Sequence, residues 1–341
     1  MVLLYSPVTP DELEGKGRAV STWGLDGIHQ VQEWASVMKW MLAVATVAVV
    51  CAGSAGFAAD QPAPESGTPA PTVHPDKGVY ALWNSTPSDQ MRDMDTDRPN
   101  KTNTPHTIDA GHLQVETGLV DSLYFRDKSN GADARTQTWS VGQFNLRLGV
   151  LNSLEVNAGV TSYVFQHFHD NLTGQTSRQS GLGDTIVGGK LNLWGNDGAD
   201  GAWATALGIQ PQVKLPTARR DLGTGHTEVV VGVPFSLILP GDVHLGLQTT
   251  PGWVRNADNT DYVTGWQNSI TVDRVFFSQW DVYAEYWSQV TTERHREGQG
   301  TVDLGVIYQM TRNLSWDTGV NLGINKSSPT VEWTVGVSLR Y

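Results

Sequence analysis

The carboxyl-terminal segment constrains the fold more than any other part of the chain. From Val331 to Tyr341, apolar side chains stand at every second position, and small or polar groups fill the positions between them. Successive side chains of a β-strand point to opposite faces, so this segment predicts a strand with one apolar and one polar face.

A terminal strand of this kind, ending on an aromatic residue, resembles the assembly signal of bacterial outer-membrane β-barrels. We expect the barrel-assembly machinery to recognise its apolar positions, which are Trp333, Val335, Val337, Leu339 and Tyr341. After residue 60 the sequence has no run of about 20 apolar residues, which a membrane-spanning helix requires. A closed barrel is the remaining way to span a membrane, because it pairs all backbone N–H and C=O groups between strands.

Composition narrows the classes of partner and compartment. The formal net charge of −12 argues against nucleic acid as a partner, because phosphate binding needs clustered Lys and Arg. The single cysteine, Cys51, excludes a disulfide framework and a thiolate zinc site.

The amino-terminal region is interpreted as a secretory signal. Lys39 precedes an apolar core at residues 41–52, and small residues follow as far as the expected cleavage site after Ala58. This order is typical of a signal peptide, which we assign to residues 38–58. A retained single-pass helix is the alternative.

The flanking segments complete the predicted domain organisation. Residues 1–37 have no place in the signal, so we interpret them as an over-extended start and Met38 as the true one. Residues 59–95 are rich in Pro, Ala, Ser and Gln and are expected to form a flexible periplasmic lead-in. The barrel itself is assigned to residues 96–341.

Alternating strand patterns recur from residue 112 to the carboxyl terminus. Twelve strands are predicted, at residues 112–124, 138–150, 154–165, 184–194, 202–215, 228–239, 243–254, 266–276, 280–290, 301–310, 314–324 and 331–341. Segments of about ten residues cross an outer membrane when tilted, and an even number is usual. The predicted fold class is all-β, a transmembrane antiparallel barrel with both ends in the periplasm.

Connection lengths favour this barrel over a secreted soluble β-sandwich or lectin-like domain. Short connections at 151–153, 240–242, 277–279 and 311–313 alternate with long ones at 126–137, 166–183, 216–227, 255–265 and 291–300. Short periplasmic turns and long external loops are typical of bacterial barrels. Tryptophans gather at or near predicted strand ends, as at a membrane–water boundary, at positions 139, 194, 203, 253, 266, 280 and 333.

Several short motifs carry a family resemblance. They are residues 96–99 (TDRP), 107–118 (TIDAGHLQVETG), 181–184 (GLGD) with Gly188 and Lys190, and 214–217 (KLPT) with 222–225 (LGTG). Their order and spacing resemble the transporter-like outer-membrane family described as "putative MetA-pathway of phenol degradation", with departures at Asn100 and Ala218. The resemblance implies an outer-membrane channel or transporter far more strongly than it implies an aromatic substrate.

Charged residues of the polar strand faces are candidates for the barrel lumen. They are Glu116, Arg147, Glu155, Lys190, Lys214, Glu228, Asp273, Asp281, Glu285, Asp303, Asp317, Glu332 and Arg340. They can pair across strands and fill a closed core, because a twelve-strand lumen is narrow. They can also line a polar pathway with a mild preference for cations, since acids outnumber bases. We expect a mixture of the two.

Two polar clusters fall in predicted external loops. His167 and His169, beside Asp170, are spaced for chelation, but no further ligand is near in sequence, so we expect solvated side chains and no metal site. Arg219 and Arg220 are candidates for lipopolysaccharide phosphates, although a solvated loop is the simpler reading.

Motifs for catalysis are missing from the sequence. It has no Gly-x-Ser-x-Gly, His-Glu-x-x-His or phosphate-binding loop. His226, Thr227 and Glu228 form the one local cluster, and consecutive strand residues face opposite ways, so we expect no enzyme, no catalytic residue and no cofactor.

We therefore expect a barrel in the outer membrane of a Gram-negative bacterium, surrounded by membrane lipid and lipopolysaccharide. Its expected function is passive or facilitated uptake of small molecules, with hydrophobic or aromatic compounds as candidates. Residues 97–111 are placed to enter the lumen as a plug. The alternative is a structural or surface-interaction barrel without transport activity.

Overall fold

The computed structural model describes residues 77–128, 131–197, 201–294 and 296–341. The proposed start at Met38, the signal at 38–58 and its cleavage site at Ala58 lie outside these residues, as do residues 59–76 of the lead-in. The described part of the lead-in has two short 3-10 helices, η2 (Lys77–Val79) and η3 (Ser88–Gln90). No helix in the described ranges is long and apolar enough to cross a membrane.

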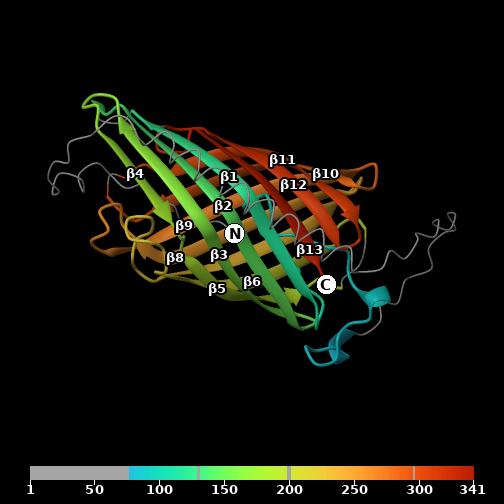
Figure 1. Ribbon diagram of the computed structural model, residues 1–341. Helices are drawn as coiled ribbons and strands as arrows, with labels where there is room; N and C mark the ends of the chain where they lie inside the picture. The colour runs from blue at the N-terminus through green and yellow to red at the C-terminus, as the bar shows by residue number, and fades with distance from the viewer. Residues whose placement is uncertain (1–76, 129–130, 198–200, 295) are drawn as a thin grey trace, which may run out of the picture. The chain divides into compact units, whose positions relative to one another are not determined.

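The described chain is built almost entirely from antiparallel strands (Figure 1). They are β1 (Leu113–Asp127), β2 (Ala134–Leu151), β3 (Leu154–Asp170), β4 (Thr176–Gly181), β5 (Thr185–Trp194), β6 (Thr205–Leu215), β7 (Glu228–Leu239), β8 (Val243–Arg255), β9 (Tyr262–Phe276), β10 (Trp280–Thr291), β11 (Gln299–Thr311), β12 (Leu314–Gly323) and β13 (Val331–Arg340).

All of these strands except β4 close into a twelve-strand barrel. Each pairs with its neighbour along the chain, β3 pairs with β5, and β1 pairs with β13 to complete the ring. The twelve-strand antiparallel prediction is confirmed. The additional strand β4 pairs only with the far end of β3, from Val164↔Gly181 to His169↔Thr176.

Two predicted loops proved to be largely strand. β1, β2 and β3 are 15, 18 and 17 residues long, so they run through much of 126–137 and into 166–183. The polar sequence there suggested loops, but a hairpin that projects from a membrane has polar side chains on both faces. His167 and His169 consequently lie in β3, and their placement in a loop was wrong.

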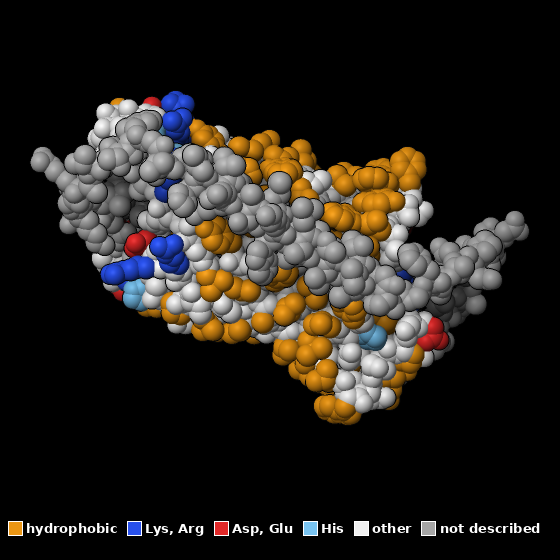
Figure 2. Space-filling model, in the orientation of Figure 1, with side chains coloured by type: hydrophobic (Ala, Val, Ile, Leu, Met, Phe, Trp, Pro, Cys, Tyr) orange, Lys and Arg blue, Asp and Glu red, His pale blue; other side chains and the backbone are white. Residues whose placement is uncertain are grey.

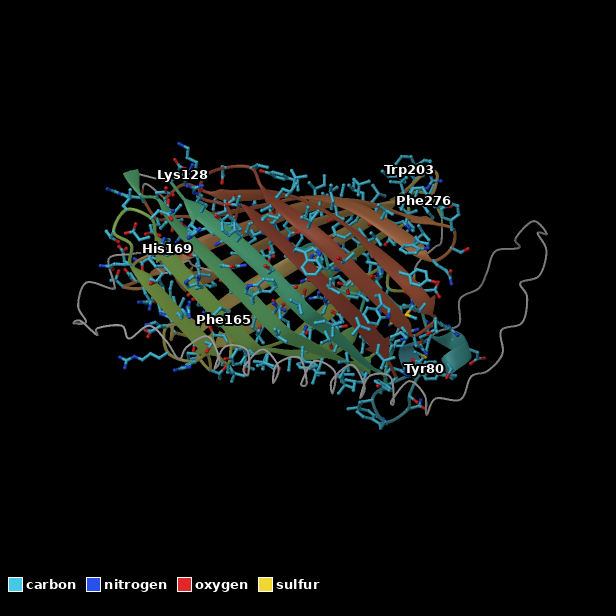
Figure 3. The ribbon with its side chains drawn as sticks, turned by 45° about the horizontal axis from the view of Figure 1, so that its top comes forward. Tyr80, Lys128, Phe165, His169, Trp203 and Phe276 are labelled. Carbon is cyan, nitrogen blue, oxygen red and sulfur yellow. The ribbon has the colours of Figure 1, made fainter. Side chains whose placement is uncertain are left out.

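The two ends of the barrel differ in their connections. The turns β2–β3, β7–β8, β9–β10 and β11–β12 are short and share one end with the carboxyl terminus. Short turns face the periplasm in bacterial barrels, so we call this the periplasmic end and the opposite one the outer end. Trp203 and Phe276 mark the periplasmic end in Figure 3, and Lys128 and His169 the outer end. The longer β5–β6 connection is an exception at the periplasmic end.

The wall of the barrel is apolar outside and polar inside. Along β13, Thr334, Gly336, Ser338 and Arg340 are buried, whereas the alternating apolar side chains, including Trp333, are half-buried or exposed. Figure 2 shows hydrophobic side chains spread over the body of the barrel. A large exposed hydrophobic surface marks a site of contact with a membrane or with another protein. Here such a surface surrounds a closed barrel, as in outer-membrane proteins.

An irregularity in β1 changes which residues face inward. The register between β1 and β13 shifts between Gly118 and Val120, so Leu119 is an extra residue. Beyond it, Leu123 pairs with Glu332 and lies opposite the buried Thr138 of β2. Directly paired residues share a face, so Leu123 faces the interior. Strict alternation from Leu113 predicts instead that Leu123 lies on the apolar outer face, and that prediction was wrong.

Candidate functional site

A segment ahead of the first strand occupies the interior of the barrel. Residues 95–109, which we call the plug, form hydrogen bonds or ion pairs with β1, β2, β3, β5, β6, β8, β9, β10, β11, β12 and β13. Asp97 and Asp109 are each only 1% exposed. The plug therefore crosses the lumen and contacts the wall on all sides.

Asp97 joins a fully buried ionic cluster on one side of the lumen. Its two carboxylate oxygens lie 2.9 and 3.1 Å from Nζ of Lys190, and one lies 3.5 Å from Nη1 of Arg147. Arg147 in turn is 2.8 Å from Glu116 and 2.9 Å from Glu155. An unpaired buried charge costs several kcal/mol, so these five residues depend on one another.

Wall carboxylates also hold the backbone of the plug. Glu155 accepts a hydrogen bond from the N–H of Ile108 at 2.9 Å. Across the lumen, the two oxygens of Glu285 accept the N–H groups of Lys101 and Thr102 at 2.8 and 2.7 Å. Charge-assisted bonds of this kind satisfy backbone donors that have no strand partner.

Arg98 lies against a part of the barrel wall that is formed by glycines. A Cβ at Gly118 would lie 2.8 Å from Nη1 of Arg98, and one at Gly336 would lie 2.7 Å from its Nε and Nη2. In this space the guanidinium donates hydrogen bonds to Asp317 at 3.2 Å and to Thr334 at 2.8 Å. The two glycines thus make room for one side chain of the plug.

Lys101 contacts the neighbouring strands of the same wall. Its ammonium group lies 2.9 Å from Asp303 and 4.8 Å from the ring centre of Trp287, a cation–π contact. Beside it, the hydroxyl group of Thr102 bonds to Glu285 at 2.5 Å and to Ser269 at 2.7 Å. The plug supplies cations here, and the wall supplies carboxylates.

The plug is anchored at the periplasmic end by a second set of ion pairs. Asp109 lies 3.4 Å from both Lys77 and Arg92 and 3.8 Å from Arg340. Lys77 and Arg92 also reach Asp197 of the β5–β6 connection, at 3.0 and 2.8 Å. These contacts tie the described lead-in to the rim of the barrel.

The carboxyl group of Asp197 is held in its charged form. Burial raises its pKa, but hydrogen bonds from Asn152 and Lys77 and the charge of Arg92 outweigh burial, so the pKa lies below its ordinary value. We call the contacts among Lys77, Arg92, Asn152 and Asp197 the rim latch.

A more exposed cluster of acidic side chains lies near the periplasmic end. The plug pair Asp95–His106, 2.9 Å apart, keeps 46% and 31% of its side-chain surface exposed. The wall pair His244–Asp273, 3.0 Å apart, is also partly exposed. Asp281 interacts electrostatically with His244. Acids therefore predominate in this partly exposed region.

The sequence-based lumen candidates differ in burial. Those buried in the structure are Glu116, Arg147, Glu155, Lys190, Lys214, Glu228, Glu285, Asp303, Asp317 and Arg340. Those partly accessible are Asp273, Asp281 and Glu332. Away from the plug, Lys214 lies 3.0 Å from Glu228 and 3.4 Å from Asp184, and Glu332 accepts a hydrogen bond from Asn321 at 2.8 Å.

The clusters noted in the outer region do not form a reaction site. Arg219 and Arg220 are exposed in the β6–β7 connection, and Arg219 bonds to the carbonyl of Ser180. Glu228 is buried against Lys214, whereas His226 is exposed beside Tyr262. In the described ranges, no three His, Cys, Asp or Glu side chains are arranged to hold a metal ion.

Sequence reasoning missed Asp121, which interacts with Arg98 inside the barrel. Counting alternate positions from Leu113 assigns Asp121 to the outer face, but the extra residue at Leu119 reverses the order. The partners of Arg98 and Lys101 were also missed, because Asp317 and Asp303 follow them by about two hundred residues, 219 and 202 respectively.

The fold matches solved outer-membrane proteins. An outer membrane channel from Pseudomonas putida F1 matches with a TM-score of 0.53 and 11% identity, over 72% of this chain and 100% of that one. The NanC porin has a TM-score of 0.40 and 12% identity, over 67% and 98% of the two chains. At such low identity the first match shows a shared fold, and the second is too weak to support more.

A family model covers nearly the whole barrel. The model described as "Putative MetA-pathway of phenol degradation" matches residues 96–341. No curated protein shows significant sequence similarity to the chain. The matched range begins with the plug, at Thr96, and ends with the closing strand at Tyr341. The chain, a twelve-strand antiparallel barrel of the outer-membrane type, therefore belongs to the family described as "Putative MetA-pathway of phenol degradation".

Proposed function

We propose that this protein is an outer-membrane channel for small molecules, closed by its own plug and opened when the plug moves. One observation carries the proposal: a separate polar segment fills the lumen and is held there by hydrogen bonds and ion pairs with the wall. Polar and ionic contacts can be exchanged for water at modest net cost, as a reversible closure requires.

The opening side is proposed to be the wall of β10, β11 and β12. There Glu285, Asp303 and Asp317 contact Lys101, Thr102 and Arg98 of the plug. If the plug withdraws, its two cations leave with it and three carboxylates remain along one wall. Carboxylates lining a pore favour cations, so we expect a mild cation preference in the open state.

The solute class is proposed as small molecules, with aromatic compounds as the first to test. The family description supports this choice, and the same wall carries two inward aromatic side chains, Tyr283 and Trp287, which are 3% and 6% exposed. Lipopolysaccharide and outer-membrane lipid are proposed as surroundings, and the barrel-assembly machinery as the partner of the closing strand. We propose no catalytic role.

A disulfide between plug and wall tests this function. The hydroxyl oxygens of Thr102 and Ser269 are 2.7 Å apart, so the double variant Thr102→Cys/Ser269→Cys brings two sulfur atoms near bonding distance. We expect small-solute flux into liposomes, and conductance in planar bilayers, to fall to background on oxidation. Both should return on reduction.

Controls separate the plug from general effects of a cross-link. Thr185→Cys/Thr217→Cys joins hydroxyl positions 2.8 Å apart in the outer region, away from the plug, and should conduct in both redox states. The oxidant should leave the flux and the conductance of each single-cysteine variant unchanged. Flux that survives a quantitative Thr102–Ser269 cross-link would contradict plug gating. The absence of flux from reduced and wild-type protein alike would favour the non-transport barrel.

A further inference from the structure

The outer ends of β1, β2, β3 and β4 form a sheet extension that barrel closure does not require. A membrane-spanning strand needs about 9–11 residues, whereas β2 has 18 and β3 has 17. β4 pairs only with this projecting part of β3. The extension therefore calls for a role other than spanning the membrane.

Burial shows which face of the extension continues the outer wall of the barrel. In β2, Ala134, Thr136 and Thr138 are buried, whereas Arg135 and Gln137, which alternate with them, are exposed. Arg135 and Gln137 therefore lie on the outward face, and so do the residues that pair directly with them on neighbouring strands.

Register places basic side chains together on this face. Arg135 pairs with His169, and the next outward row pairs Gln137 with His167 and His167 with Arg178. We call Arg135, His167, His169 and Arg178 the basic face. Both arginines are exposed, and Figure 2 shows Lys and Arg side chains gathered at the end of the barrel that carries β4.

An aromatic row lies directly below the basic face. Trp139 pairs with Phe165, two residues from the Gln137–His167 row and four from the Arg135–His169 row. With a rise of about 3.3 Å per residue and a tilt of about 40°, the two rows stand about 5 and 10 Å above the aromatic row. Aromatic belts mark the membrane boundary, and the headgroup layer beyond it is about 5–8 Å thick.

Carboxylates are confined to the tip of the extension. The outward residues of these three rows are Ser122, Tyr124, Arg126, Arg135, Gln137, Trp139, Phe165, His167, His169, Thr176, Arg178 and Ser180. Near the tip, Asp133 lies 3.1 Å from Arg126, and Asp170 accepts a hydrogen bond from Thr173. None of the outward residues in these rows is acidic. The row that contains Arg178 lies at headgroup height, and the row that contains Arg135 lies just above it, within reach of the long arginine side chain.

We propose that the basic face binds the phosphate groups of lipopolysaccharide in the outer leaflet, with Arg135 and Arg178 as the principal contacts. Guanidinium groups donate paired hydrogen bonds to phosphate, and the histidines add shorter-range donors beside them. Acyl chains of the same molecule would lie against Trp139 and Phe165. This inference is independent of transport, because it concerns the outside of the wall.

Binding of defined lipids to the purified, folded barrel tests the proposal. We would titrate detergent-solubilised protein with bisphosphorylated lipid A, lipid A without phosphates, phosphatidylglycerol and inorganic phosphate, reading bound lipid by native mass spectrometry. We expect lipid A to bind best. Arg135→Gln and Arg178→Gln should each weaken it about fivefold, as expected for one cation near an anionic surface.

A matched arginine at the other end of the barrel provides the control. Arg274 lies near the periplasmic end of β9, is exposed, and stacks on the ring of Phe276 at 5.6 Å. Arg274→Gln should leave lipid A binding unchanged, and heat-dependent gel mobility will verify that every variant is folded. Equal binding of phosphate-free lipid A or of phosphatidylglycerol, or wild-type affinity in both Arg135→Gln and Arg178→Gln, would overturn the proposal.

Discussion

The two sides of the lumen hold the plug in different ways. On the side of β1, β2 and β3, the wall already contains an arginine, Arg147, between Glu116 and Glu155, and the plug adds Asp97. On the side of β10, β11 and β12, the wall presents Glu285, Asp303 and Asp317, and the nearby cations come from the plug.

This difference gives the two clusters different roles: the first stabilises the folded barrel, and the second stabilises the closed state of the channel. The first cluster remains internally paired without the plug, so it belongs to the folded wall. The second cluster leaves carboxylates facing one another when the plug leaves, which raises the free energy of the open state and attracts cations. Asp97 pairs with Lys190 of β5, whereas its neighbour in the chain, Arg98, pairs with Asp317 of β12, so one short segment contributes to both clusters.

The largest expected effect is a loss of stability when the cluster around Arg147 is changed. Arg147→Met leaves Glu116 and Glu155 buried without their cation, and we expect the free energy of unfolding to fall by about 3–5 kcal/mol. Denaturant titration of the folded form by gel mobility measures the loss. The triple variant Glu116→Gln/Arg147→Met/Glu155→Gln should recover most of it, because no unpaired charge remains. Wild-type stability of Arg147→Met would remove the distinction between the two sides.

A smaller effect, on opening and not on folding, is expected where Arg98 lies against glycine. Gly336→Ala places a Cβ 2.7 Å from the guanidinium and from Oδ2 of Asp317, so the flexible side chain must leave. Loss of its charge-assisted bonds should raise the open-to-closed ratio about tenfold in single-channel recordings.

A second interior glycine supplies the control for that measurement. At Gly232 a Cβ would meet its nearest atoms at 3.6 Å, an ordinary contact, so Gly232→Ala should gate as wild type does. If Gly336→Ala and Gly232→Ala open equally often, Arg98 does not hold the plug closed.

The smallest effect concerns the rim latch and depends on pH. The pKa of Asp197 is lower in the folded protein than its ordinary value of 3.8, so its stabilising contribution is complete above that value. The contribution is lost as the pH falls through the lowered pKa. Asp197 is 20% exposed, so we expect less than about 1 kcal/mol.

Thermal unfolding between pH 6 and pH 2 measures the contribution of the latch. Asp197→Asn should be slightly less stable than wild type at pH 6, and the two should converge at the acidic end. Asp242→Asn, in the exposed β7–β8 turn, serves as the control and should follow wild type throughout. A constant difference between Asp197→Asn and wild type across the range would rule out a titrating latch.

Much of the fold could be predicted because strand alternation is a local property. Each polar position of β13 between Thr334 and Arg340 is buried, as its sequence spacing requires. Register errors began where a local pattern was interrupted without a sequence signal, at Leu119, and they carried Leu123 and Asp121 to the wrong face. A single extra residue reverses every later side chain in a strand.

The sequence by itself determined the strand order, the apolar outer wall and the polar inner wall, because these follow from alternation and from the pairing of successive strands. The sequence also placed residues 97–111 as a candidate plug, but only the tertiary structure decided how the plug is held, which glycines receive Arg98, and which carboxylate pairs with Lys101. Those contacts join residues far apart in the chain, such as Arg98 and Asp317. No local pattern encodes them, since they exist only after closure of the ring brings β10, β11 and β12 around the plug.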